Sequence, residues 1–277
     1  MVRGIGIMQG RLTPPVRDRI QAFPADGWRD EFSGAHAANL SCIEWIYETS
    51  GRDRNPLCTD DGIREMGALS ARYDVSIRSL CADYFMEEPL VRAKGATLDS
   101  RMAHLRWLID RCQKAGIERI VLPFVDASDI RTSDEESALV DVLTEAQRAA
   151  SVVGVEVHLE TSLNPPRFAE FLARLPDAVR VNYDSGNSAS LGYVPAEEFS
   201  AYGSRIGSVH VKDRLRGGTT VPLGTGSADL PAVFAGLQCL DYRGDLILQV
   251  ARDAPGHEVD WARRNRDFVE AALRSWI

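Results

Sequence analysis

The chain has 277 residues, of which 44% are hydrophobic and 26% are charged, so it is long enough to bury a sizeable core. Its net charge of −8 would repel a nucleic-acid backbone or an anionic membrane surface, and neither partner is expected. No apolar run reaches the roughly 20 residues that a membrane span needs, and the five scattered cysteines lack a CxxC pair, which indicates a reducing cytoplasm rather than a disulfide framework.

Short apolar runs rich in β-branched residues recur along the chain and predict eight strands. In chain order they are 4–8 (GIGIM), 42–46 (CIEWI), 76–82 (SIRSLCA), 119–125 (RIVLPFV), 155–160 (VEVHLE), 179–184 (VRVNYD), 207–211 (GSVHV) and 245–250 (DLILQV). A segment with helical character follows each run. Two examples are 61–73 and 99–116, the second with apolar residues three and four positions apart.

Helix boundary signals agree with this alternation. Ser133 precedes three acidic residues, which favours a helix start, while Gly116 and Gly154 stand where helix-ending glycines are expected before a strand. Eight strand–helix units predict a parallel sheet that closes on itself, and we expect an α/β fold, a (β/α)8 TIM barrel with a single domain over residues 1–277. An open doubly wound sheet is the alternative, but GIGIMQGR lacks the GxGxxG spacing. The long loop at 9–27, which carries three prolines, is expected to cover the barrel mouth.

Polar residues end the last four predicted strands, at Glu160, Asp184, His210 and Gln249. A barrel would bring these strand ends together at its C-terminal mouth, where such folds place their sites. Two carboxylates, one imidazole and one amide oxygen suit one divalent metal ion: Mn²⁺, Mg²⁺, Co²⁺ or Zn²⁺. Any one of these residues alone would be explained by a hydrogen bond or a helix cap, but four at consecutive strand ends predict a metal site.

Several motifs resemble those of the sugar phosphate isomerase/epimerase superfamily, the barrels related to xylose isomerase that include the ketose 3-epimerases. They are VEVHLET (155–161), VNYDSGN (181–187), GSVHVKDR (207–214), VPLGTG (221–226) and GDLILQVAR (244–252), together with IGIMQGRL (5–12), IQAFP (20–24) and CADYFM (81–86). The resemblance spans nearly the whole chain and concerns the superfamily, not one substrate. It implies a metal held by Glu, Asp, His and Glu, which here are Glu160, Asp184, His210 and position 249. It also implies that the first and fourth glutamates move a proton beside a carbonyl whose developing charge the metal stabilises.

This chain departs from that pattern because the amide of Gln249 cannot accept a proton. Two-base epimerisation through this pair is therefore in doubt. A one-base isomerisation with Glu160 as the catalytic group, a hydride shift, and an epimerisation with another second group all remain open. Candidates for such a group near the mouth are Glu44, Lys212, Asp213 and His158. We favour a supporting role beside the metal for His158, which shares the strand parity of Glu160.

Cationic and aromatic residues that follow the strands are candidates for holding the substrate. Guanidinium groups bind carboxylates and phosphates, so the arginines after the first, seventh and eighth strands would suit an anionic sugar. The predicted substrate-binding residues are Gln9, Arg11, Tyr84, His158, Asn187, Arg214 and Arg252. The alternative is that the arginines pair with nearby aspartates and that the aromatic residue belongs to the core.

The leading hypothesis is a divalent-metal-dependent isomerase or epimerase acting on a sugar, sugar phosphate or sugar acid through a metal-stabilised enediolate. A keto-polyol dehydratase or lyase on the same metal site and a non-catalytic sugar-binding barrel are the alternatives. An apurinic-site endonuclease of the same fold is disfavoured, because few histidines end strands and the net charge is −8. We expect a cytoplasmic protein with a small-molecule carbohydrate substrate, and the sequence leaves a homodimer open.

Overall fold

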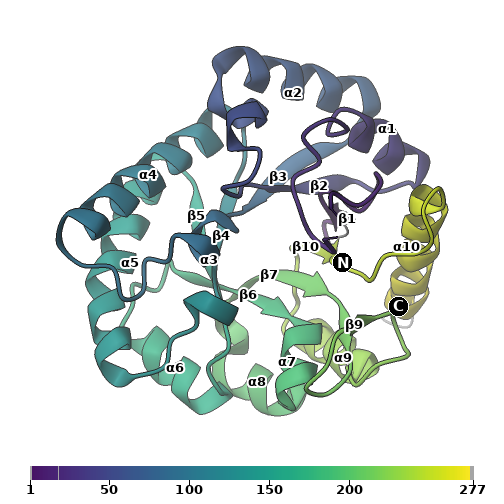
Figure 1. The fold of residues 1–277 in the computed structure, drawn as a ribbon. Helices are drawn as coiled ribbons and strands as arrows, with labels where there is room; N and C mark the ends of the chain where they lie inside the picture. The colour runs from purple at the N-terminus through teal and green to yellow at the C-terminus, as the bar shows by residue number, and fades with distance from the viewer. Residues whose placement is uncertain (1, 18, 275–277) are drawn as a thin grey trace.

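The eight predicted strands are present and close into a parallel barrel in the computed structural model, which describes residues 2–17 and 19–274 (Figure 1). They are β1 (Gly4–Met8), β2 (Cys42–Ile46), β3 (Ser76–Cys81), β4 (Arg119–Phe124), β5 (Glu156–Thr161), β6 (Arg180–Asp184), β7 (Ile206–Val211) and β10 (Asp245–Leu248). Neighbours in the chain are neighbours in the barrel, and β10 pairs with β1 to close it. The predicted (β/α)8 TIM barrel is therefore confirmed.

Helices surround the barrel and connect its strands (Figure 1). They are α1 (Asp30–Ala37), α2 (Asp60–Tyr73), α3 (Tyr84–Glu87), α4 (Gly95–Lys114), α5 (Ser133–Val153), α6 (Pro165–Ala173), α7 (Ser185–Leu191), α8 (Pro195–Tyr202), α9 (Leu230–Cys239) and α10 (Glu258–Arg274). Four 3-10 turns, at 52–54, 56–58, 126–128 and 203–205, complete the helical segments of the described residues. None of the helices in the described ranges combines the length and the apolar character that crossing a membrane requires.

Helix ends follow from local side chains. The hydroxyl of Thr132 accepts a hydrogen bond from the Glu135 backbone and caps α5, one residue before the cap position predicted at Ser133. Gly154 ends the same helix in the left-handed region at φ 73°, as predicted for a helix-ending glycine.

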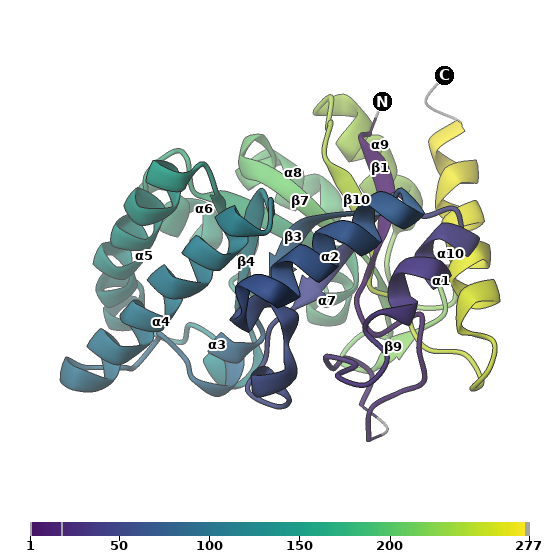
Figure 2. The ribbon, with the colours of Figure 1, turned by 90° about the horizontal axis from the view of Figure 1, so that it is seen from above.

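The C-terminal ends of the strands form the mouth of the barrel. In the side view of Figure 2, the loop after β1, α3 and the strand β9 (Thr220–Val221) gather at this edge. β9 pairs antiparallel with β8 (Asp213–Arg214), a short hairpin that follows β7. Asp213 is fully buried and accepts backbone hydrogen bonds from Gly224, Gly226 and Ala228, so it shapes the loop after the hairpin.

The opposite end of the barrel is closed by a buried ion cluster around Asp245, at the start of β10. Arg78 donates to both oxygens of this carboxylate, at 3.0 and 2.8 Å, and Arg119 donates to Oδ2 at 3.2 Å. Asp245 is fully buried, so its charge depends on these two guanidinium groups. Polar chemistry at this end is thus used for structure, which leaves the mouth as the place for a site.

Candidate metal and active site

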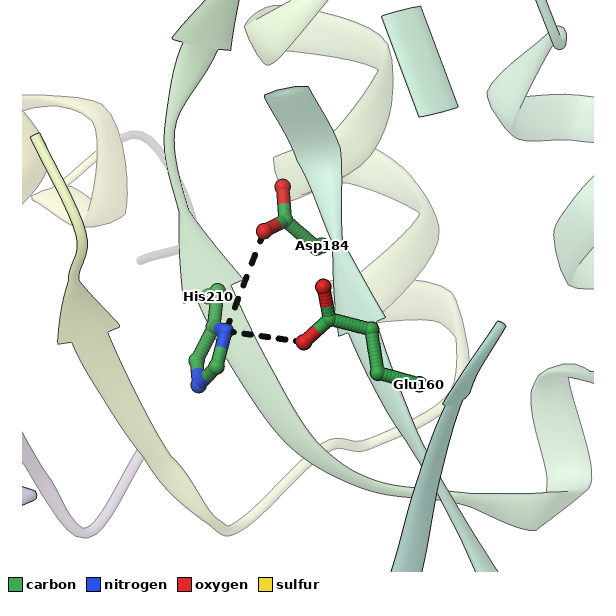
Figure 3. Close-up of side chains that lie close together, drawn as sticks. All are labelled: Glu160, Asp184 and His210. Carbon is green, nitrogen blue, oxygen red and sulfur yellow. Dashed lines mark ion pairs between the residues drawn. The ribbon is translucent and has the colours of Figure 1, made fainter. Parts of the chain in front are cut away.

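Glu160, Asp184 and His210 lie together at the mouth, at the ends of β5, β6 and β7 (Figure 3). One ligand atom from each residue lies within 4.8 Å of the other two, and all three side chains are buried. His210 Nδ1 is 3.3 Å from Glu160 Oε2 and 3.8 Å from Asp184 Oδ2. Asp184 is the register partner of His210 in the β6–β7 pair, which explains why strand ends far apart in sequence meet here.

His210 is held from below by Glu44 of β2. Its Nε2 lies 2.6 Å from Glu44 Oε1, and both side chains are fully buried. Burial alone would lower the pKa of His210, but the charge of Glu44 and hydrogen bonds to the neighbouring carboxylates raise it well above its ordinary value. The cluster therefore favours positive charge at this point, supplied either by a proton on His210 or by a cation.

This arrangement fits a divalent metal ion. If Nε2 carries the proton shared with Glu44, Nδ1 presents its lone pair to the same space as the two carboxylates. Two carboxylate oxygens and one imidazole nitrogen are ligands that Mg²⁺, Mn²⁺, Co²⁺ and Zn²⁺ accept. The predicted catalytic residue Glu44 thus lies beneath the cluster, where it contacts His210.

Asp184 has two functions in the structure. Its Oδ1 accepts hydrogen bonds from the backbones of Gly186 and Asn187 at 2.9 and 2.8 Å and caps α7. Its Oδ2 faces Lys212 Nζ at 3.3 Å and His210. Burial alone would raise the pKa of Asp184, but the charge of Lys212 and the contacts with His210 outweigh it and lower the pKa. The capping bonds fix the carboxylate while leaving one oxygen for the cluster.

Glu160 is oriented by two asparagine amides. Asn182 Nδ2 donates to Oε2 at 2.9 Å, and Asn187 Nδ2 donates to Oε1 at 2.5 Å. Asn187, predicted to bind substrate, also accepts hydrogen bonds at Oδ1 from Lys212 at 3.2 Å and from Arg214 at 2.8 Å. The side-chain amide of Asn187, on α7, therefore links the carboxylate of Glu160 to the charged groups of Lys212 and Arg214.

Gln249 follows β10 and faces Lys212. Its Oε1 accepts a hydrogen bond from Lys212 Nζ at 3.0 Å, while its Nε2 donates to Gln21 Oε1 at 2.9 Å. The oxygen predicted as the fourth metal ligand is thus in contact with an ammonium group that also reaches Asp184. Its role as a ligand stays a prediction.

Two residues at the mouth were not among the sequence candidates, namely Gln21 and Asp83. Gln21 Nε2 donates to Asp83 Oδ2 at 2.7 Å, and Asp83 is 5% exposed. Burial raises the pKa of Asp83 to about 6, with a smaller contribution from the charges of Glu48 and Glu160 and an opposing one from its two hydrogen-bond donors. Both residues lie in motifs already noted, IQAFP and CADYFM, but neither motif indicates which side chain turns inward.

The predicted substrate-binding arginines Arg11 and Arg252 hold the loop after β1. Arg11 donates to the carbonyl oxygens of Val250 and Ile20, and Arg252 donates to those of Ile20, Thr13 and Gly10. Burial, with the nearby charge of Arg252, lowers the pKa of Arg11 to about 9. Their donors are therefore largely used by backbone carbonyls, and a contact with substrate stays a prediction.

The other predicted substrate-binding residues lie in three different surroundings. Gln9 is fully buried, accepts a hydrogen bond from the Ile46 backbone, and within the described residues its Nε2 has no hydrogen-bond partner. Tyr84 stacks on His104 of α4 with ring centroids 4.3 Å apart. His158 bonds to Ser208 at 2.7 Å, and Ser208 donates to Asn182, so His158 supports the cluster from one layer below. Burial lowers the pKa of His158 despite the nearby carboxylate of Glu156.

Comparisons with known proteins agree with this fold. The profile of a family described as xylose isomerase-like TIM barrel matches residues 32–272. An inosose dehydratase from Geobacillus kaustophilus (strain HTA426) is 29% identical over 165 residues, which cover 50% of this chain and 53% of that protein. The chain thus matches about half the length of this curated relative.

Solved structures of low sequence identity share the whole barrel. An L-ribulose 3-epimerase is 16% identical with a TM-score of 0.79, covering 100% of this chain and 96% of that chain. A xylose isomerase-like TIM barrel protein from Mycobacterium smegmatis in complex with magnesium is 17% identical with a TM-score of 0.72, covering 99% and 97%. The IOLI protein with a bound zinc atom is 15% identical with a TM-score of 0.74, also covering 99% and 97%. Because these sequence identities are low, the similarity shows a shared fold and nothing more specific.

Proposed function

Because this chain belongs to the xylose isomerase-like TIM barrel family, we propose that it is a divalent-metal-dependent isomerase or epimerase of a sugar, sugar phosphate or sugar acid. The observation that carries the proposal is the buried group of Glu160, Asp184 and His210 at the catalytic face of the barrel. Two similar structures contain magnesium and zinc, which supports a divalent ion as the cofactor.

The residues that would hold the ion are Glu160, Asp184 and His210, with Gln249 as the fourth. When bound, a divalent ion supplies positive charge that polarises a ketose carbonyl and stabilises the negative charge that develops on it. Glu44 fixes the ring of His210 through Nε2, and we assign it a positioning role rather than a direct one.

Glu160 would act as the base. The amides of Asn182 and Asn187 hold its carboxylate at 2.9 and 2.5 Å, so it would meet the substrate in one orientation. It would remove the proton from the carbon beside the carbonyl and leave an enediolate, which is the intermediate common to isomerisation and epimerisation.

Lys212 and Arg214 favour a substrate that carries negative charge. Both cations donate to the same acceptor, Asn187 Oδ1, and of the two only Lys212 has a carboxylate of the described residues, Asp184, within hydrogen-bond distance. Position 249 adds a neutral amide beside them. A phosphate or carboxylate of the substrate would supply the missing negative charge, while Lys212 would stabilise an oxygen of the substrate.

A second candidate function is dehydration of a keto-polyol. The inosose dehydratase that is 29% identical over half of this chain favours it. Dehydration begins with the same proton removal by Glu160 but ends with loss of a hydroxyl group as water, so the two functions differ in their products.

A product screen in D2O tests the proposal. The protein would be loaded with Mn²⁺, Mg²⁺, Co²⁺ or Zn²⁺ and incubated with ketoses, sugar phosphates, sugar acids and an inosose. We expect an isomer with deuterium at the reacting carbon, and loss of turnover on chelation. Formation of an unsaturated or deoxy product instead would favour the dehydratase. Isomerisation without deuterium would replace proton transfer by a hydride shift, and binding of sugar without turnover would favour a non-catalytic barrel.

A further inference from the structure

Among the described residues at the mouth, the proposed function uses one base, Glu160. Epimerisation needs a proton removed from one face of a carbon and returned to the other, yet Gln249 has an amide that cannot exchange a proton. Another buried carboxyl group at the mouth would have to supply the second proton transfer. The candidates among the described residues are Glu31, Glu44, Glu48, Asp83 and Asp213.

The other four carboxylates are held by structural partners, although Oε2 of Glu44 has no hydrogen-bond partner among the described residues. Glu44 bonds to His210, and Asp213 accepts three backbone N–H groups. Glu31 accepts from the backbones of Gly10 and Leu12 and from the Thr13 hydroxyl, which fixes the loop after β1. Glu48 accepts from the Phe23 backbone and pairs with Arg19 at 2.7 Å.

Asp83 is different because its partners are a neutral amide and a thiol. Gln21 donates to Oδ2 at 2.7 Å, and the Cys81 thiol donates weakly to Oδ1 at 3.1 Å. Within the described residues Asp83 forms no ion pair. A buried carboxylate that lacks an ion pair is costly to keep charged, so this side chain is well suited to carry a proton.

The barrel places Asp83 across the mouth from His210, one of the three metal-ligand candidates. Asp83 follows β3, and β3 stands four strands from β7, which carries His210, in either direction around the eight-stranded barrel (Figure 1). Glu160 ends β5, two strands from β3, and its charge acts on Asp83. A substrate held between β3 and β7 would meet Asp83 at the β3 side of the mouth and Glu160 at the β5 side.

A line of hydrogen bonds ties Asp83 to the rest of the site. Lys212 donates to Gln249, Gln249 donates to Gln21, and Gln21 donates to Asp83. The amide at position 249 thus connects the metal side of the mouth with the carboxyl group on the opposite side.

Resting on the proposed function, we propose that Asp83 is the second proton-transfer group of this enzyme and acts on the substrate face opposite Glu160. Glu160 takes the proton from the carbon beside the carbonyl: the C–H bond breaks, an O–H bond forms on Glu160, and the electron pair enters the carbon–carbon bond as the carbonyl π pair moves to oxygen. Asp83 then gives its proton to the same carbon from the other face. Its O–H bond breaks, a C–H bond forms and the carbonyl returns.

The substrate keeps its composition and one centre is inverted. Glu160 ends as the acid and Asp83 as the carboxylate, and both exchange protons with water before the next turnover.

The groups around Asp83 suit a role in proton transfer. The pKa of Asp83 is raised to about 6, by burial first and also by the charges of Glu48 and Glu160, while the hydrogen bonds from Gln21 and Cys81 act in the other direction. The charges of Asp83 and Arg11 also interact, which opposes this rise. A group titrating near neutral pH is an effective acid and base.

Asp83→Asn is the direct test, with Asp126→Asn as the matched control on the exposed loop after β4. The Mn²⁺-loaded proteins would be incubated in D2O with L-ribulose and then with each ketose that reacts in the screen. Deuterium in recovered substrate reports on Glu160, and inverted product reports on both groups. We expect Asp83→Asn to retain deuterium exchange and Mn²⁺ affinity while inversion falls by about 100-fold or more. The control should match the wild type.

A second readout needs neither metal nor substrate. In the metal-free protein at pH 5, one component of the infrared carbonyl absorption of buried protonated carboxyl groups should be lost in Asp83→Asn, while the component of Glu31, whose pKa burial raises to about 7, should remain. Inversion at the wild-type rate in that variant, or equal loss of exchange and metal binding, would overturn the role of Asp83 alone. Absence of both exchange and inversion in the wild type with every ketose would instead overturn the proposed function, and this inference with it.

Discussion

The side-chain amide of Gln249 donates from Nε2 to Oε1 of Gln21 at 2.9 Å, and its neighbours determine the direction of this bond. On one side the ammonium group of Lys212 can only donate a hydrogen bond, so the amide of Gln249 turns its oxygen toward Lys212. On the other side Nε2 of Gln21 donates to Oδ2 of Asp83, which leaves the oxygen of Gln21 for Gln249. A carboxylate at position 249 would have no hydrogen to donate and would face the oxygen of Gln21. The amide is therefore the side chain that this set of partners requires.

Gln249→Glu is expected to retain the fold and the metal site but to lower the free energy of unfolding by about 1–3 kcal/mol, the cost of an unsatisfied buried polar group. Urea unfolding of the metal-free protein measures the change. Adding Gln21→Lys should recover much of the loss, because the ammonium group can donate to both carboxylates. Equal stability of Gln249→Glu and the wild type would contradict the role given to this hydrogen bond.

Glu160→Gln is expected to reduce turnover by about 100- to 10,000-fold, because an amide cannot take the substrate proton. The amide oxygen remains available to a metal, so calorimetric titration with Mn²⁺ should still show binding. Glu170→Gln, on the exposed side of α6, makes the same change away from the mouth and should leave turnover unchanged. A Glu160→Gln variant with wild-type turnover would show that the base lies elsewhere.

Glu44→Gln is expected to weaken metal binding by about 10- to 100-fold, because the carboxylate no longer fixes His210 through Nε2. Titration with Zn²⁺ and Mn²⁺ gives the affinities, and Glu170→Gln again serves as the control. Circular dichroism and thermal unfolding would establish that the variant is folded. Unchanged affinity in a folded variant would show that Glu44 does not act through His210.

His104 is expected to make stability depend on pH. Burial, with the charge of Arg52, lowers the pKa of this ring to about 4, whereas an unfolded histidine titrates near 6.5. As the pH falls below about 6.5 the unfolded chain takes up the proton first, so stability is lost between pH 6.5 and 4. Because the ring is partly exposed, the loss should be on the order of 1 kcal/mol.

His104→Phe keeps a ring against Tyr84 but cannot titrate, so its unfolding free energy should fall less than that of the wild type over this pH range. Urea unfolding at pH 7 and pH 4.5 gives both differences. Parallel losses in the two proteins would assign the pH dependence to other groups.

Asp245→Asn is expected to destabilise the protein by about 3–5 kcal/mol, because Arg78 would lose its carboxylate partner in the closed end of the barrel and Arg119 would keep only the more exposed Glu118. Chemical unfolding measures the loss. The exposed Asp241, which pairs only with Arg243 among the described ion pairs, provides a matched Asp→Asn control with little expected effect. A small effect at both positions would mean that the cluster is more hydrated than its burial indicates.

The strands were predictable because each is a short apolar run with clear boundaries. The meeting of Glu160, Asp184 and His210 was predictable because they end such runs in register. The place of Gln21 at the mouth was not predictable, because it depends on the path of a long loop and not on a periodic pattern. That path requires a turn at Gly10, where φ is 80° and a Cβ atom would lie 2.5 Å from the Ala22 carbonyl oxygen. Similarly, sequence identified Arg11 as a cation near the mouth but could not indicate that its donors meet backbone carbonyls.

The bonds from Arg11 and Arg252 join the loop after β1 to the segment after β10, near opposite ends of the chain. During synthesis, the first of these segments leaves the ribosome more than 200 residues before the second. Glu31 and Glu48 can hold the loop that carries Gln21 early, but its bonds to residues 249–252 form only when that segment arrives, so this part of the mouth is completed late. A nascent chain that lacks β10 would therefore have neither a closed barrel nor a completed entrance.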